Sequence, residues 1–273
     1  MKYIKVFFLF LIYFFLTIII SSEYFTFWLE GKFFNNTYGS YFIVQWILLV
    51  LDAITVILLV YVMLGFSFKK LFDGMANPIK DINSWRFFAF IVFVSSISVV
   101  SVFLIDHFSF IKDSISKSDF HTISPGMIKT RPFFFLFLTK AFLAGPFFEE
   151  LFFRKGIMDF LGNKKNYLFV ILFSSILFAF AHIHKGMAIP AFLIGIILSA
   201  VYLRFGFFAS FLLHAVINLI NAFVVPSLYK TLFTIFPENL MTIAVIVFIF
   251  SALMLVIIIR KILKEINMQT SFQ

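Results

Sequence analysis

The chain has 273 residues, of which 62% are hydrophobic and only 13% are charged, and phenylalanine alone occupies 46 positions. Ordinary soluble domains carry about 25% charged residues, and a soluble protein of this composition would expose far more apolar surface than water tolerates. The composition therefore excludes a soluble enzyme, a disordered chain and a nucleic-acid-binding domain. The sequence contains no cysteine, which excludes disulfides, thiolate metal ligands and a cysteine nucleophile.

Apolar segments that approach the length of a membrane span recur along the sequence. A transmembrane helix needs about 20 apolar residues, and the fifth and sixth of the eight segments found are shorter than this. We predict an all-α fold, a polytopic transmembrane helix bundle of about eight spans in the lipid bilayer of the cell membrane. In chain order, the predicted spans are Ile4–Ile20, Tyr41–Phe66, Phe87–Ile105, Phe133–Leu161, Tyr167–Ala181, Ala188–Leu203, Phe207–Val225 and Leu240–Ile259.

The first segment ends at Ser21 and Ser22 and also has features of a signal peptide. We favour a transmembrane helix, because the apolar run is long for a signal sequence and further spans follow it. If the N-terminus is cytoplasmic, more of the Lys and Arg residues fall on the cytoplasmic side than on the outer side. In a chain of net charge +9, this distribution favours cytoplasmic N- and C-termini.

The first of three polar clusters inside the predicted spans covers residues 149–154. Ionisable residues inside a span are costly and are therefore candidates for function. Glu150 and Arg154 lie one helical turn apart and are expected to pair. Glu149 points about 100° away, and its carboxylate is a candidate general base. The alternative is a charge cluster at a helix end without a catalytic role.

The other two clusters centre on histidines. His182 lies near the end of the fifth span, and the alternative for it is a residue of the membrane interface. In the seventh span, His214 and Asn218 share a helix face with Ser210 and Asn221. The alternative for this polar stripe is hydrogen bonding between helices, and we prefer that interpretation for Ser210 and Asn221.

The predicted turns indicate that the three clusters lie at similar depths in the membrane. Asn163–Asn166 is the turn between the fourth and fifth spans, and both Glu149 and His182 lie roughly 20–25 Å from it. The turn at Arg204–Gly206 is expected on the same membrane side, and the third cluster lies about 12–20 Å from it. Residues that only join helices have no reason to converge in this way, so the depths favour a shared functional site.

The clusters resemble the three motifs of the CPBP family, the CAAX protease and bacteriocin-processing family, to which the Ras-converting CAAX endopeptidases are related. The resemblance covers about residues 133–225 and implies an eight-helix intramembrane endopeptidase. One departure is Lys155, which stands between Arg154 and Gly156 where glycine commonly follows the arginine, and it puts the helix packing there in question. The matching motifs are Glu149-Glu150-x-x-x-Arg154, Phe178-x-x-x-His182 and His214-x-x-x-Asn218.

The resemblance also implies roles for the motif residues. It implies that Glu149 and His182 activate water. It further implies that His214 and Asn218 stabilise the oxyanion and that Glu150 and Arg154 orient the site. One Glu and two His side chains could also bind zinc with an open position, but the sequence holds no HExxH motif. We predict a metal-free, glutamate-type site, with zinc as the alternative. The implied partners are a peptide or membrane-protein substrate and the bilayer, and no nucleic acid.

The resemblance divides the chain into three predicted parts. Residues 1–131 form N-terminal transmembrane helices and polar loops, residues 132–225 form the CPBP catalytic core, and residues 226–273 form a C-terminal transmembrane helix with a basic tail. The alternative function is a non-catalytic membrane scaffold or a bacteriocin-immunity protein. The complete set of motif residues favours the protease, because a scaffold could lose any one of them without harm.

Two charged residues outside the motifs, Asp52 and Lys140, have similar predicted depths. Opposite charges in lipid tend to pair, because each alone is costly, and an ion pair between these two is one hypothesis, although the predicted bundle offers other neighbours. The alternative is that Lys140 extends to the interface and that Asp52 is protonated.

Overall fold

The structure is a computed structural model that describes residues 2–21, 38–65, 131–162, 167–183 and 188–224, together with a few single residues outside these ranges. Every element in these ranges is a helix, and no strand occurs in them, which confirms the predicted all-α fold. The predicted spans Phe87–Ile105 and Leu240–Ile259 lie outside the described ranges.

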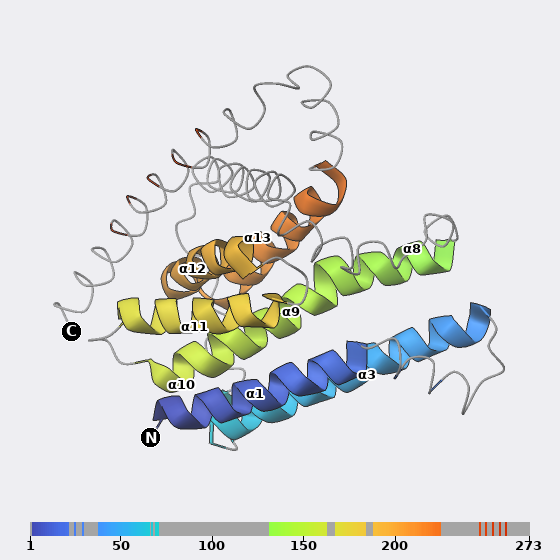
Figure 1. The fold of residues 1–273 in the computed structure, drawn as a ribbon, viewed down its shortest axis with the longest axis horizontal. Helices are drawn as coiled ribbons and strands as arrows, with labels where there is room; N and C mark the ends of the chain where they lie inside the picture. Colours follow the sequence, from blue (N-terminus) through green and yellow to red (C-terminus); the bar gives the residue numbers. More distant parts are fainter. Residues whose placement is uncertain are drawn as a thin grey trace. The chain divides into compact units, whose positions relative to one another are not determined.

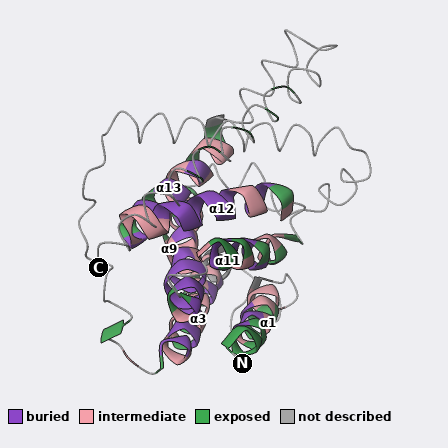
Figure 2. Cartoon of the chain, turned by 90° about the vertical axis from the view of Figure 1, so that its left-hand side faces the viewer, coloured by how far each residue is buried: buried purple, intermediate pink, exposed green. Residues whose placement is uncertain are grey.

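Several described helices have the length and composition of membrane spans. Lys2–Ile20, Phe42–Met63 and Ala188–Phe205 are long and apolar enough to cross a bilayer, and Tyr167–Ala181 and Phe207–Phe223 are shorter apolar helices. Parts of these helices are exposed (Figure 2), and the exposed residues include large apolar ones such as Phe8, Leu58, Phe169, Ile189 and Leu212. Such surfaces are stable against lipid and not against water, so the chain is a membrane protein.

The described helices divide into two compact units, and each is described by itself. The first unit contains α1 (Lys2–Ser21), α3 (Tyr38–Met63) and one continuous helical run over residues 131–161 (Figure 1). In this run, α-helical segments alternate with π-helical segments, which are wider and rare. Its elements are α8 (Arg131–Leu138), η2 (Thr139–Ala144), α9 (Gly145–Glu150), η3 (Leu151–Met158) and α10 (Asp159–Leu161).

The sequence Gly145-Pro146 explains the π-helical segment η2. Pro146 has no backbone N–H, and its ring would collide with the carbonyl four residues earlier in a regular α-helix. The helix widens here, and the Gly145 N–H donates to the carbonyl of Lys140, five residues back. A Cβ at position 145 would lie 2.7 Å from that same oxygen, so glycine is needed for this turn. The segment α9, which carries Glu149 and Glu150, therefore begins directly after a wide turn.

A close approach joins α3 to η3 within the first unit. Gly156 is fully buried, and a Cβ there would lie 2.9 Å from Met63 Cε and 3.1 Å from Val60 Cγ2. Small residues let membrane helices pack closely, and packing contributes much of their association energy. Gly156 thus fits the helix against α3, although Lys155 separates it from the motif arginine.

The second unit contains α11 (Tyr167–Ala181), α12 (Ala188–Phe205), α13 (Phe207–Leu219) and the π-helical turn η6 (Ile220–Val224). Gly206 joins α12 to α13 with φ of 86°, a conformation that costs other residues energy. This confirms the turn predicted at Arg204–Gly206. The two helices bury a shared apolar core (Figure 2), which includes Ile194, Ile197, Leu198, Val201, Leu213 and Ile217.

Helices α11 and α12 approach each other closely at a small-residue contact. A Cβ on Gly195 of α12 would lie 3.1 Å from both Cα and Cβ of Ser175 on α11. The boundary between the two units falls between Leu161 and Gly162, inside the segment 132–225 that we predicted as the catalytic core. The predicted domain boundaries stay predictions.

Candidate active site

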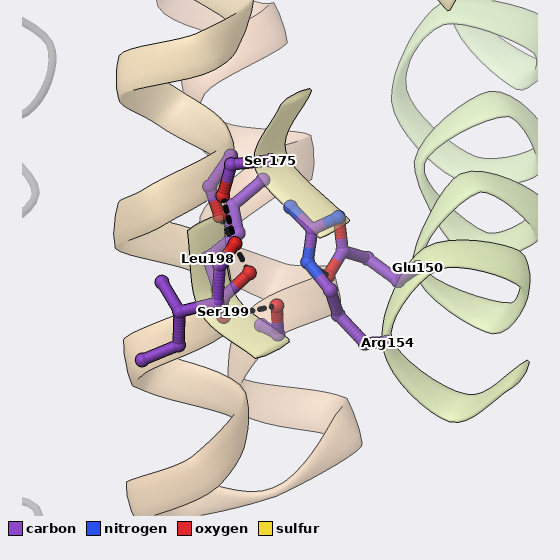
Figure 3. Close-up of polar contacts among 8 residues, drawn as sticks. Glu150, Arg154, Ser175, Leu198 and Ser199 are labelled. Carbon is purple, nitrogen blue, oxygen red and sulfur yellow. Dashed lines mark hydrogen bonds and ion pairs between the residues drawn. The ribbon is translucent and has the colours of Figure 1, made fainter. Parts of the chain in front are cut away.

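The first motif holds a buried ion pair, as the spacing predicted. Arg154 Nε lies 3.2 Å from Glu150 Oε2, and both side chains have 0% exposure. In Figure 3 the two side chains point toward one another. A buried ion pair is strongly coupled, because removing one partner leaves an uncompensated charge in an apolar setting. The pair therefore links the end of α9, where Glu150 lies, to Arg154 in η3.

Lys155, the residue that departs from the family pattern, also forms an ion pair. Lys155 is buried, and its Nζ lies 2.8 Å from Asp159 Oδ2, one turn further along the helix. Since this carboxylate balances the charge of Lys155 and Gly156 still contacts α3, the departure leaves the packing of this segment intact.

Glu149 is the last but one residue of α9, and its surroundings differ from those of Glu150. The side chain is half-buried, and its Oε2 atom is fully buried. Its charge also acts on Arg154, although Glu150 is the carboxylate in the ion pair with that arginine. Two adjacent carboxylates thus occupy different environments, which is a common way to give them different chemical roles.

His182 lies just beyond the end of α11, and its ring has a defined tautomer. Its Nδ1 lies 2.8 Å from the backbone carbonyl of Phe178. A carbonyl oxygen only accepts hydrogen bonds, so Nδ1 carries the proton, and in the neutral ring Nε2 keeps its lone pair. This arrangement makes Nε2 able to accept a proton or bind a metal.

Phe178 links the second motif to the third within the second unit. Its ring centroid lies 4.5 Å from that of His182 and 5.7 Å from that of His214, with a T-shaped arrangement toward His214. One aromatic side chain of α11 therefore contacts both His182, just beyond the end of that helix, and His214 on α13. The structure brings these two motif residues into the same neighbourhood.

The polar stripe on α13 combines two kinds of residue. His214 is buried and Asn218 is half-buried one turn later. Ser210 Oγ donates to the carbonyl of Leu198 on α12 at 3.0 Å, which confirms the predicted hydrogen bond between helices. Asn221 Oδ1 is buried without a hydrogen bond to the described part of the chain. The role in joining helices is thus confirmed for Ser210 and not for Asn221.

The two units divide the predicted site. Glu149, Glu150 and Arg154 belong to the first unit, whereas the histidines and Asn218 belong to the second. The structure shows the arrangement within each unit, and the convergence of all three motifs stays a prediction. Among the described residues, no group of three His, Asp or Glu side chains is arranged to hold a metal ion. The metal-free site likewise stays a prediction.

Comparison with known proteins identifies the family in the same segment. The fold defines a helical membrane protein, and residues 131–220 match the family described as Type II CAAX prenyl endopeptidase Rce1-like. This match confirms the resemblance found in the sequence, and the matched segment contains every predicted site residue. No curated protein and no solved structure matches the chain.

Proposed function

We propose that the protein is a CAAX-type intramembrane endopeptidase that hydrolyses a peptide bond of a peptide or membrane-anchored protein. The match of residues 131–220 to a family of prenyl endopeptidases carries this proposal, because all six site residues lie within the matched segment. The buried ion pair and the contacts of Phe178 with both histidines add physical support.

In the proposed reaction, Glu149 and His182 activate a water molecule. Glu149 accepts a proton from water, and the resulting hydroxide attacks the carbonyl carbon of the scissile bond. The C–N bond then breaks, and the departing amine takes the proton. The Nδ1–H of His182 is engaged by Phe178, so Nε2 is the ring atom available to hydrogen-bond the water.

The remaining site residues act on charge and geometry. His214 and Asn218 donate hydrogen bonds to the oxyanion that forms when hydroxide attacks, a kind of stabilisation that is strong in a low-dielectric site. Glu150 and Arg154 orient the segment that carries Glu149, since their buried pair locks the adjacent turn. The proposed division of roles thus assigns catalysis to Glu149 and positioning to Glu150.

The test is quantitative peptidomics of membranes that contain either the intact protein or Glu149→Gln. We expect peptides that depend on the intact protein to disappear in the variant, because loss of a general base lowers the rate about 10²–10⁴-fold. Glu265→Gln is the matched control, because it makes the same chemical change outside the matched segment. Identical peptide profiles for the intact protein and Glu149→Gln at equal abundance would favour a scaffold or immunity protein.

We propose that the reaction needs no metal. The purified protein should keep its activity after exhaustive chelation and contain no stoichiometric zinc. Complete loss of activity that zinc restores would establish the alternative, in which Glu and His side chains bind the ion around an open position.

We also propose that both termini lie in the cytoplasm. The absence of cysteine makes any introduced cysteine a unique label. Lys2→Cys and Ser271→Cys should react with a membrane-impermeant maleimide only after the cells are opened. Labelling of either residue in intact cells would reverse this orientation.

A further inference from the structure

The first helix carries two polar residues in an otherwise apolar span. Between Val6 and Ile20, only Tyr13 and Thr17 are polar, and polar residues inside a span are candidates for function. They lie one turn apart, on the same face as Val6 and Phe10. This face is buried, since Val6, Phe10 and Tyr13 are 0–5% exposed and Thr17 Oγ1 is buried.

Ring contacts show that α1 runs antiparallel to the run that carries the first motif. Lys5 Nζ lies 5.3 Å from the ring centroid of Phe160. Further along α1, the centroid of Phe10 lies 6.4 Å from that of Phe153. Each step forward along α1 therefore corresponds to a step back along residues 149–160.

This register places Glu149 close to the level of Thr17, which lies one turn after Tyr13 on α1. The ring of Tyr13 stacks on Phe152 at 4.2 Å, with an interplanar angle of 19°. Thr17 lies about 6 Å beyond Tyr13 along α1, and Glu149 lies about 4.5 Å before Phe152 along its own helix. The hydroxyl of Thr17 and the carboxylate of Glu149 are therefore at nearly the same level.

Tyr13 also covers the face on which Glu149 lies. Glu149, Phe152 and Phe153 are spaced i, i+3 and i+4, so their side chains share one face of the helix. The Tyr13 ring contacts both phenylalanines, with centroid distances of 4.2 Å and 5.8 Å.

Asp52 reaches the same level from α3. It lies in the middle of a stripe whose other members, Val44, Leu48, Val56 and Val60, are 0–4% exposed, and its Oδ1 atom is buried. Two contacts set the register of α3, one between Gln45 and Lys140 and the other between Val60 and Gly156. Both show that α3 runs parallel to residues 131–161.

The parallel register brings Asp52 close to the level of Glu149. Asp52 follows Gln45 by seven residues, so it lies level with the residue seven positions after Lys140, which is Phe147. Phe147 lies less than one turn before Glu149. Tyr13, Thr17 and Asp52 are thus polar residues from two helices whose levels along the unit span about 7.5 Å, and this span includes the level of Glu149. We call these three residues the N-terminal polar cluster.

We infer that Tyr13 is a positioning residue for Glu149, and that the N-terminal polar cluster holds this carboxylate in place through hydrogen bonds from hydroxyl groups of α1. The inference rests on the proposed function, because it takes Glu149 as the general base. It extends the functional site to Tyr13, Thr17 and Asp52, which lie outside the family match at 131–220.

The decisive variant is Tyr13→Phe, which keeps the ring that stacks on Phe152 and removes only the hydroxyl. Proteoliposomes are assayed with a farnesylated, internally quenched CAAX peptide or, if the intact protein does not cleave it, with the substrate found by peptidomics. We expect kcat to fall about 10–100-fold, as for the loss of a hydrogen bond to a charged group, while KM changes less than about twofold. Tyr61→Phe on α3 is the matched control and should retain the kcat of the intact protein.

A second measurement tests the contact without relying on activity. The thermal stabilities of Tyr13→Phe, Glu149→Gln and the double variant form a cycle, and contacting groups give non-additive effects. Additive stabilities, or an unchanged kcat in Tyr13→Phe, would overturn the inference. If Tyr13→Phe does not accumulate, Thr17→Val replaces it, with a fall in kcat as the expected result. Full activity of Glu149→Gln would instead overturn the proposed function.

Discussion

The two units bury polar groups in different ways. In the first unit the polar residues in the buried class are charged and form ion pairs, Glu150 with Arg154 and Lys155 with the exposed Asp159. In the second unit most of them are serines, and three of these hydroxyls donate to backbone carbonyls (Figure 3). These bonds are Ser175 to Ile171 at 2.7 Å, Ser199 to Gly195 at 2.7 Å and Ser210 to Leu198 at 3.0 Å.

This difference determines which kind of change each unit tolerates. A buried ion pair cannot lose one member cheaply, because the other remains as an uncompensated charge. A serine hydroxyl that donates to a carbonyl of a helix costs much less stability when it is removed, because that carbonyl also accepts the helical hydrogen bond. The second unit depends more on volume, since Gly195 and Ser175 allow α11 and α12 to approach closely. We therefore expect the first unit to be sensitive to charge and the second to size.

The largest effect is expected from Arg154→Ala. The change leaves Glu150 without its partner at 0% exposure, which costs about 3–5 kcal/mol for a buried pair. The protein should lose both stability and activity, measured as the apparent melting temperature and the abundance of purified protein in detergent. As a control, Glu150→Gln combined with Arg154→Met removes both charges and should recover stability. Normal stability of Arg154→Ala would show that the ion pair contributes nothing.

The next effect compares two glycines, one in each unit. Gly195→Ala places a methyl group 3.1 Å from the backbone Cα of Ser175, which cannot move easily, and should cost about 1–3 kcal/mol. Gly156→Ala meets the flexible end of Met63 at 2.9 Å and Val60 Cγ2 at 3.1 Å; because these are side-chain atoms, we expect a smaller loss, about 1 kcal/mol. Thermal unfolding of the two variants in the same detergent measures the difference. Equal losses would contradict the view that the second unit is the one limited by size.

A smaller effect concerns the hypothetical pair of Asp52 and Lys140. The structure shows Lys140 Nζ donating to Gln45 Oε1 at 2.9 Å, and Gln45 lies two turns before Asp52 on α3. The pairing stays a hypothesis. If it forms, Asp52→Asn and Lys140→Met each lower stability, and the double variant recovers about 1 kcal/mol relative to additivity. Strictly additive effects would leave Gln45 as the significant partner of Lys140.

The smallest effect is expected from Ser210→Ala. It removes the hydrogen bond between α13 and α12, and such bonds between membrane helices contribute about 0.6 kcal/mol on average. Thermal unfolding should shift only slightly, with unchanged activity. A loss as large as that of Arg154→Ala would show that neutral polar groups are as critical as charged ones, which would remove the distinction between the units.

The sequence predicted local features well, because short spacings fix them. The pair of Glu150 and Arg154 follows from residues one turn apart, and the turn at Gly206 follows from a glycine between two apolar runs. The bond from Ser210 to α12 was predicted as a link between helices, although its acceptor, Leu198, could not be named. The acceptor depends on how α12 and α13 are placed, which spacing along one helix does not determine.

Other features were not predicted from the sequence, and most of them depend on contacts between distant segments. The π-helical segment η2 had a local signal in Gly145-Pro146, since proline disrupts the α-helical bond pattern. The position of Phe178 between two histidines had none, because it depends on the packing of α11 and α13. The level of Tyr13 beside Phe152 depends in the same way on the register of α1.

The wide turn η2 also constrains the length of the chain. An i→i+5 hydrogen bond encloses one residue more than the usual i→i+4 bond, so the turn at Thr139–Ala144 holds one residue in excess of a regular helix. Deleting a single residue there would restore the regular register and rotate everything that follows by about 100° relative to α8. Glu149 would then turn away from the face that Tyr13 covers, with no change in its own side chain. Residues 139–144 therefore tolerate an exchange of apolar side chains far better than a change in number.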